Sequence, residues 1–371
     1  MTADTSPCAT TTSPAAVRAA RARRIAGSVG VNYLPSWAAD PPRTWAGDLP
    51  IDRLRAELAL ARSIGFGHVR VWLDAPTWVL DPPGYERNVT CLLDAAHEHG
   101  LGLVAILFDS CGVDRDATAT SRSIGSLLAD PGVPTDDLER WVHSFGPGHR
   151  SHLDATRFVH VAWSGEPTVV LWEGWRSNPG EDALDAPGES WSRYATELAR
   201  ILDAHPAVIA AEIMNEPWIA ARSDPGRRRA IDDFVVRTVR TIRSAAPELP
   251  LTVGAESADD IAAHERVVTS ALGDDDGLDL VSWHCYGDGD EIAATAATAR
   301  AAARARPYYL SEWGCFPGTD DDDLAAVVES AFEVLSDNET HPDPHVRIEL
   351  VHQLALAAGG HGMVGGQMLD L

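Results

Sequence analysis

The chain has 371 residues with 55 acidic and 30 basic side chains, a formal net charge of −25, and no lysine among the basic residues. Such an acidic surface repels phosphate backbones and anionic lipid, which argues against nucleic-acid and membrane partners. No apolar run approaches the ~20 residues that span a bilayer. Hydrophobic residues make up 45% and charged residues 23%, values that exclude disordered and fibrous classes.

The N-terminal sequence is rich in Thr, Ser, Pro and Ala, and an Arg-rich stretch follows it. It lacks the apolar segment of a signal peptide, so we expect a cytoplasmic protein. We predict a flexible tail over residues 1–24 and one catalytic domain over residues 25–371. In an alternative interpretation, residues 15–24 take the place of a helix that is missing at the other end of the chain.

Short apolar runs alternate with amphipathic segments along the whole chain. Strands are predicted, in chain order, at 25–33, 68–73, 101–108, 207–214, 251–255, 278–286, 308–313 and 363–369. Helices are predicted between them at 51–64, 89–99, 191–204, 227–245, 259–272, 291–306 and 345–358. The alternation indicates a parallel sheet, and eight such units in this length predict a closed (β/α)8 barrel.

Two connections are long: residues 110–190 after the third strand, and residues 316–344 after the seventh. Both leave the C-terminal ends of strands, where barrel enzymes build their active sites. The first connection carries Trp141 and Trp175, and an indole offers a flat apolar face suited to a sugar ring. We therefore expect this segment to roof the barrel mouth, which favours an enclosed pocket over an open groove.

Two carboxylates stand at the C-terminal ends of predicted strands on opposite sides of the barrel. Glu216 follows the fourth strand and Glu312 ends the seventh. Closure of the barrel brings such residues face to face across the mouth. A pair of carboxylates flanking a sugar bond is the minimal machinery of glycoside hydrolysis, one protonating the leaving oxygen and the other attacking the anomeric carbon.

Further polar residues are predicted around this pair. Strand alternation places His284 and Tyr286 on one face of the sixth strand, where they can orient the carboxylates. Arg70 lies on the second strand and can meet groups from the fourth and sixth strands, because even-numbered strands share interior layers. Glu212, four residues before Glu216, is expected to pair with Arg70 in a structural role. Three more residues near the mouth are candidate substrate contacts: Asp109, Glu256 and Trp313.

Taken in order, these motifs resemble those of the retaining glycoside hydrolases of clan A, the family-5-like cellulase superfamily. The resemblance extends over about residues 25–370 and is carried by Arg70, Asn215-Glu216-Pro217, His284-x-Tyr286 and Glu312-Trp313-Gly314.

The resemblance implies a double displacement with retention of configuration and no cofactor. Glu216 would be the acid/base and Glu312 the nucleophile, while Asn215 would hold the sugar 2-hydroxyl. Arg70 would lie beneath the nucleophile. Two residues would support the carboxylate pair: His284 and Tyr286.

The sequence thus predicts a retaining β-glycosidase that hydrolyses small glycosides or oligosaccharides in an exo manner. Three alternatives remain open: a transglycosidase with the same two carboxylates, a non-catalytic sugar-binding barrel, and a metal-dependent hydrolase. The last would use the histidines of the first long connection, whose spacing matches no standard zinc motif: His143, His149, His152 and His160. We expect no metal site.

Overall fold

The computed structural model describes residues 12–33, 35, 44–45, 47–63, 65–73, 75, 78, 81–109, 191–218, 225–273, 276–285, 289–313, 361–364 and 367–370. Seven of its strands form one parallel sheet in the order β1-β2-β3-β4-β5-β6-β7. Their bounds are Gly30–Asn32 (β1), His68–Trp72 (β2), Gly102–Asp109 (β3), Val208–Asn215 (β4), Leu251–Ala255 (β5), Val281–Cys285 (β6) and Tyr308–Trp313 (β7).

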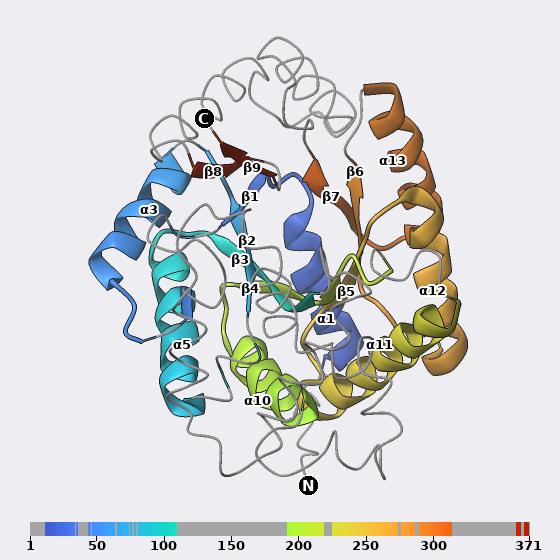
Figure 1. Ribbon diagram of the computed structural model, residues 1–371, viewed down its shortest axis with the longest axis horizontal. Helices are drawn as coiled ribbons and strands as arrows, with labels where there is room; N and C mark the ends of the chain where they lie inside the picture. Colours follow the sequence, from blue (N-terminus) through green and yellow to red (C-terminus); the bar gives the residue numbers. More distant parts are fainter. Residues whose placement is uncertain are drawn as a thin grey trace, which may run out of the picture.

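The sheet curls into a nearly closed ring with helices on its outside (Figure 1). These helices are α3 (Ile51–Ser63), α5 (Pro82–Glu98), α10 (Trp191–Ala204), α11 (Pro225–Ala245), α12 (Ala258–Leu272) and α13 (Gly289–Ala303). The (β/α)8 barrel class predicted from the sequence is confirmed by this arrangement. The two long connections predicted after the third and seventh strands, and the helix predicted at 345–358, lie outside the described residues.

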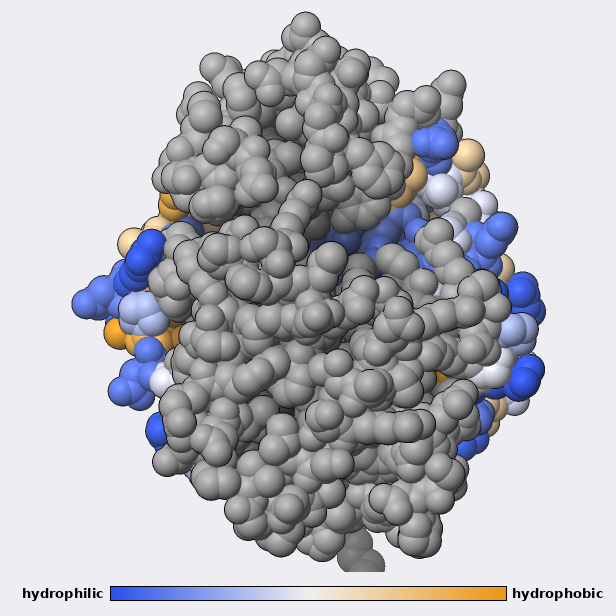
Figure 2. All heavy atoms as spheres, in the orientation of Figure 1, coloured by the Kyte–Doolittle hydropathy of each residue, from blue (hydrophilic) through white to orange (hydrophobic). Residues whose placement is uncertain are grey.

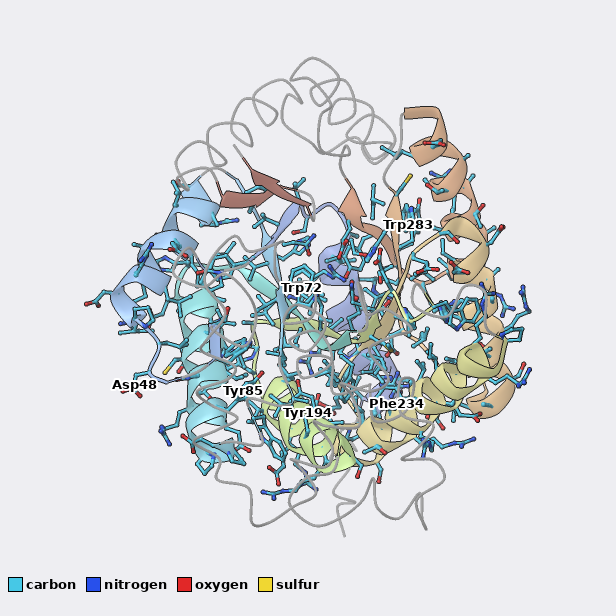
Figure 3. All side chains as sticks on the ribbon, viewed as in Figure 1. Asp48, Trp72, Tyr85, Tyr194, Phe234 and Trp283 are labelled. Atoms are coloured by element: carbon cyan, nitrogen blue, oxygen red, sulfur yellow. The ribbon has the colours of Figure 1, made fainter. Side chains whose placement is uncertain are left out.

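Aromatic side chains pack the outer helices onto the strands. Figure 3 labels Tyr194 on α10 and Phe234 on α11, and both rings contact Phe108 of β3, with centroids 5.4 Å and 4.9 Å away. All three side chains are almost completely buried. Burial of apolar surface of this kind is the main favourable contribution to folding.

Helix α5 begins seven residues before the helix predicted at 89–99. Asp81 is its N-cap, with Oδ1 accepting a hydrogen bond from the backbone N–H of Gly84 at 3.1 Å. Pro82 occupies the first helical position, which suits a residue without an N–H. The start of the helix is therefore set by its capping residue, Asp81, and not by the apolar periodicity on which the sequence prediction was based.

The N-terminal segment differs from the flexible tail that was predicted over residues 1–24. Pro14–Ala22 forms helix α1, and Arg23–Ile25 forms a 3₁₀ turn, so the first strand starts only at Gly30. In Figure 1 helix α1 overlaps the ring of strands, and it contacts β4. Arg18 of this helix is 4% exposed, and its Nε pairs with Asp279 Oδ1 at 2.9 Å.

This segment seals the interior of the barrel from below. Ala22 and Ile25 belong to one buried apolar cluster with residues from four strands or their entries: Val104, Ile209, Ala210, Leu280 and Tyr309. The charged groups nearer the C-terminal end of the barrel are therefore separated from its N-terminal end by this apolar cluster. The segment thus fills the base of the ring; the rest of the predicted domain division stays a prediction.

The last part of the chain forms an antiparallel pair, where the sequence predicted one strand at 363–369. Strand β8 (His361–Val364) pairs with β9 (Gln367–Asp370), and the dipeptide Gly365-Gly366 connects them in sequence. A two-residue Gly-Gly connection is typical of a tight hairpin, which explains the split. Strand β8 lies against β1, next to the open seam of the ring.

In the part of the chain that the structure describes, no helix combines the length and apolar composition that a membrane span requires. The cytoplasmic location predicted from the N-terminal sequence stays a prediction.

Candidate active site

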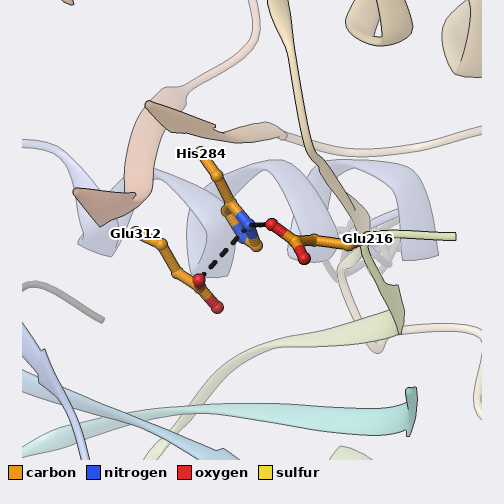
Figure 4. A group of neighbouring side chains, drawn as sticks. All are labelled: Glu216, His284 and Glu312. Carbon is orange, nitrogen blue, oxygen red and sulfur yellow. Dashed lines mark hydrogen bonds and ion pairs between the residues drawn. The ribbon is translucent and has the colours of Figure 1, made fainter. Parts of the chain in front are cut away.

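Glu216 and Glu312 meet at the C-terminal end of the barrel. Glu216 follows β4 directly and Glu312 lies in β7; their exposed fractions are 6% and 5%. A carboxylate oxygen of each, together with a ring nitrogen of His284, lie within 4.8 Å of one another (Figure 4). Figure 2 shows hydrophilic surface in a hollow of the face that is also seen in Figure 1.

The backbone at Glu216 is held in an unusual conformation. Its φ is +41°, in the left-handed region, although Glu216 is not glycine and precedes Pro217. Such a conformation costs on the order of 1–3 kcal/mol and persists only where the surroundings impose it. The backbone N–H of Glu216 donates to the carbonyl oxygen of Gly254 on β5 at 2.9 Å, which fixes the turn.

His284 of β6 lies between the two carboxylates. Its Nδ1 donates to Glu216 Oε1 at 2.7 Å and is 3.4 Å from Glu312 Oε2. Burial alone lowers the pKa of His284, but attraction by Glu312 and the hydrogen bond to Glu216 outweigh it, and the pKa is raised. Arg70 Nη2, which can only donate, lies 3.4 Å from Nε2 of the same ring, so Nε2 is the acceptor and Nδ1 carries the hydrogen.

Arg70 of β2 lies beneath this group, 2% exposed. Its Nη1 donates to Glu312 Oε1 at 2.6 Å, and its Nη2 donates to Asn215 Oδ1 at 2.7 Å. Nε and Nη2 donate to the two oxygens of Glu212 at 2.9 Å and 2.6 Å. Burial lowers the pKa of Arg70, but the two carboxylates Glu212 and Glu312 reverse this effect and raise it well above its usual value.

Sequence reasoning missed Asn32. This residue ends β1 and is 3% exposed; its Oδ1 accepts from Arg70 Nη1 at 2.9 Å. Its Nδ2 donates to the carbonyl oxygen of Ser311, the residue before Glu312, at 3.0 Å. The available signal was a single amide at the end of an apolar strand, Gly30-Val31-Asn32, at the level where the other strands carry their polar residues.

The structure thus brings together Arg70, Asn215, Glu216, His284 and Glu312, and it confirms the predicted pairing of Arg70 with Glu212.

The other predicted substrate contacts stay predictions. Asp109 ends β3 in register with Asn215, and Trp313 ends β7; the side chains of both lie outside the described residues. Glu256 follows β5 and is half-buried. Three aromatic candidates lie outside the described residues altogether: Trp141, Trp175 and Tyr286.

Glu216, His284 and Glu312 could each offer one ligand atom to a metal ion. The three side chains are better suited to share protons among themselves than to bind a metal ion. Nδ1 of His284 carries a hydrogen that a metal would have to displace, and Arg70 already donates to Glu312 at 2.6 Å. The four histidines of the first long connection, considered in the metal-dependent alternative, lie outside the described residues.

Solved structures share this arrangement of strands and helices. A GH5_18 variant from Streptomyces cattleya, in complex with Manb1-4GlcNAc, matches with a TM-score of 0.55 and 19% identity over 84% of this chain and 68% of that one. The fold is that of the GH5 glycoside hydrolases. An endo-1,4-beta-mannanase from Rhizomucor miehei matches with a TM-score of 0.50 and 14% identity, covering 84% of this chain and 83% of its own.

A longer protein also shares this fold. An exo-beta-1,4-mannosidase from Opitutaceae bacterium strain TAV5 matches with a TM-score of 0.50 and 16% identity over 83% of this chain, which spans about half, 49%, of that one. No family model matches the sequence, and no curated protein matches it. The fold that the resemblance implied is therefore confirmed.

Proposed function

We propose that this protein is a retaining β-glycosidase that hydrolyses small glycosides or oligosaccharides. The observation that carries the proposal is the short distance between two buried carboxylates from β4 and β7, with oxygens of Glu216 and Glu312 within 4.8 Å of each other. Retaining enzymes hold their carboxyl groups about 5–5.5 Å apart, whereas inverting enzymes leave roughly 6.5–9.5 Å for a water molecule. The observed distance supports the retaining mechanism.

In the first step, Glu312 attacks the anomeric carbon while Glu216 gives a proton to the glycosidic oxygen, and the aglycone departs. In the second step, Glu216 takes a proton from water as that water attacks the anomeric carbon, and the bond from this carbon to Glu312 breaks to release the Glu312 carboxylate. Glu312 is suited to attack because Arg70 Nη1 donates to its Oε1 at 2.6 Å and His284 Nδ1 lies 3.4 Å from its Oε2, so that the carboxylate is held in position. Asn215, held by Arg70, would bind the sugar 2-hydroxyl.

His284 prepares Glu216 for its double role. Because Nδ1 donates to Oε1 of Glu216, the other oxygen, Oε2, is left to carry the acidic proton toward the leaving group. The same hydrogen bond holds the carboxylate in place when it becomes the base. His284 is in this proposal a positioning residue for Glu216.

Exo action on small substrates is the finer part of the proposal. It is based on the tryptophan-rich connection over residues 110–190, which we expect to roof the mouth and leave a pocket. Mannosides and short disaccharides belong in any substrate panel, because a structure of the same fold holds Manb1-4GlcNAc.

A panel of α- and β-nitrophenyl glycosides, including mannosides, tests the proposal. We expect release of nitrophenol from at least one β-glycoside, and NMR of the first-formed sugar to show retention of the β configuration. A product with inverted configuration would refute the double displacement. Absence of activity on every glycoside of the panel would refute the assignment as a glycosidase. Comparison of products with and without an alcohol acceptor distinguishes hydrolysis from transglycosylation. Comparable turnover on a long soluble polymer and on a disaccharide would contradict the pocket.

A further inference from the structure

Glu212 is a third buried carboxylate beneath the active site, and the proposed reaction does not use it directly. It lies four residues before Glu216 on β4, and it is completely buried. Its two oxygens accept from Nε and Nη2 of Arg70 at 2.9 Å and 2.6 Å, a bidentate arrangement. Such a fork fixes orientation as well as charge.

The guanidinium of Arg70 has five N–H groups, and the structure supplies an acceptor for each. Two go to Glu212, and the remaining three reach Asn32, Glu312 and Asn215. Glu212 accepts from the edge of the guanidinium formed by Nε and Nη2, so Nη1 is free to point at the proposed nucleophile, Glu312. If this edge were released, the group could rotate, and its contacts with Glu312 and Asn215 would be lost together.

The charge balance during the reaction gives Glu212 a second task. Before attack, the single positive charge of Arg70 faces two buried carboxylates, Glu212 and Glu312. In the glycosyl-enzyme, Glu312 becomes an uncharged ester. Without Glu212, the guanidinium would then be buried beside no anion on either edge, a costly state in a low-dielectric interior.

We propose that Glu212 is a positioning residue for the reaction, which aims Arg70 at Glu312 and Asn215 and stays as its counter-ion when Glu312 is esterified. This inference deepens the proposed function and rests on it. It assigns Glu212 more than the structural pairing that its sequence position suggested.

The geometry of β5 offers an independent way to disturb Glu212. A Cβ added at Gly254 would lie 2.3 Å from Glu212 Oε1 and 3.3 Å from His284 Nε2. Gly254→Ala therefore displaces the Glu212 carboxylate from Arg70 while its charge is kept. Glu212→Gln does the reverse, since it keeps the shape and removes the charge.

A matched control is available one strand away. Thr252 is the register partner of Glu212, is equally buried, and donates to Ser282 Oγ at 3.2 Å without contact to Arg70. Thr252→Val removes one interior hydrogen bond and should lower the melting temperature without changing the pH–rate profile.

The test measures kcat, KM, the pH–rate profile and the melting temperature of the whole chain on the best substrate of the glycoside panel. For Glu212→Gln we expect kcat to fall on the order of 100-fold, as for a misplaced catalytic group. We also expect the acid limb to move to lower pH, since a negative charge near the nucleophile is gone. Gly254→Ala should lower kcat without a shift of the acid limb. If Glu212→Gln fails to fold, the kcat of Gly254→Ala tests the inference in its place.

Two outcomes would overturn the inference while the proposed function stands: an active wild type whose Glu212→Gln variant keeps kcat and the pH profile, or, if that variant does not fold, a Gly254→Ala variant with wild-type kcat. A wild type that is silent on every glycoside would instead overturn the proposed function, and the inference with it.

Discussion

Asn32 Nδ2 donates a hydrogen bond to the backbone carbonyl oxygen of Ser311 across 3.0 Å, although 279 residues separate the two in sequence. The contact joins the first and seventh strands of the sheet at the seam of the ring. Ser311 precedes Glu312, and Asn32 Oδ1 also accepts from Arg70. One buried amide thus fixes both the backbone that carries the proposed nucleophile and the cation beneath it.

Replacement of the proposed nucleophile should separate activity from stability. In Glu312→Gln, the amide oxygen can still accept from Arg70, which remains paired with Glu212. We expect turnover to fall by several orders of magnitude while the melting temperature changes by only a few degrees. Steady-state kinetics and thermal unfolding provide both values. A variant with near-normal turnover would remove Glu312 from the nucleophile role.

The proposed acid/base should show a dependence on the leaving group. A dinitrophenolate departs without a proton, whereas an alkoxide or a sugar needs one. Glu216→Gln should therefore slow hydrolysis of a disaccharide by ~10²–10⁴-fold, with a much smaller effect on formation of the glycosyl-enzyme from a dinitrophenyl glycoside. Burst kinetics on the dinitrophenyl substrate measures the first step. An equal loss on both substrates would contradict the assignment.

The pKa of His284 should depend on its carboxylate neighbours. Burial lowers it, and Glu312 and Glu216 raise it to a net upward shift. Removal of the larger raising contribution in Glu312→Gln should move the pKa of His284 down, which NMR titration of imidazole signals can follow. The remaining imidazole signals serve as internal controls, and an unchanged His284 titration would contradict the geometry.

This shift has a consequence for stability. A raised histidine pKa stabilises the folded state below the unfolded value of about 6.5, and this contribution is lost as pH rises through the folded value. The free energy of unfolding of wild type relative to Glu312→Gln should therefore decrease above pH ~6.5. Chemical denaturation at a series of pH values measures both free energies of unfolding. A difference between wild type and Glu312→Gln that increases with pH would contradict the prediction.

His68 should destabilise the protein in acid. It is buried at the entry of β2, its Nδ1 lies 2.8 Å from Ser28 Oγ, and burial lowers its pKa to about 4. The unfolded chain binds the proton near pH 6.5, so stability present above that pH is lost as pH falls toward 4. His68→Gln should weaken this dependence in chemical denaturation. The same substitution at exposed His97 is the control, and identical slopes for both variants would refute the prediction.

Helix α1 should be part of the folding unit. Arg18 Nε donates to Asp279 at 2.9 Å and Nη1 to the carbonyl oxygen of Pro247 at 2.8 Å, in a buried setting. Arg18→Ala should cost about 2–4 kcal/mol, since Asp279 keeps its second partner, Arg243. Arg53→Ala, at a pair with 54% and 21% exposure, should leave the melting temperature unchanged. Equal effects of the two substitutions would show that α1 contributes nothing to stability.

The sequence placed the strands well wherever apolar runs were bounded by helices with clear periodicity. It failed at the two ends of the barrel. Residues 14–22 were predicted to be part of a tail because the N-terminal sequence is rich in Thr, Ser, Pro and Ala and then in Arg, and the burial of Ala22 against Val104 and Leu280 depends on partners distant in sequence. The last predicted strand is instead an antiparallel pair of strands with a Gly-Gly dipeptide between them, and a search for apolar runs does not detect that dipeptide.

The alternation that makes a barrel and the residue types at the ends of its strands can be predicted from local properties, because strand and helix periods and the order of polar residues are local. The contacts of the five N–H groups of Arg70 with four side chains from β1, β4 and β7, and the place of His284 between Glu216 and Glu312, become visible only in the folded chain. Such distances depend on ring closure, strand register and the left-handed turn at Glu216, which involve the whole chain at once.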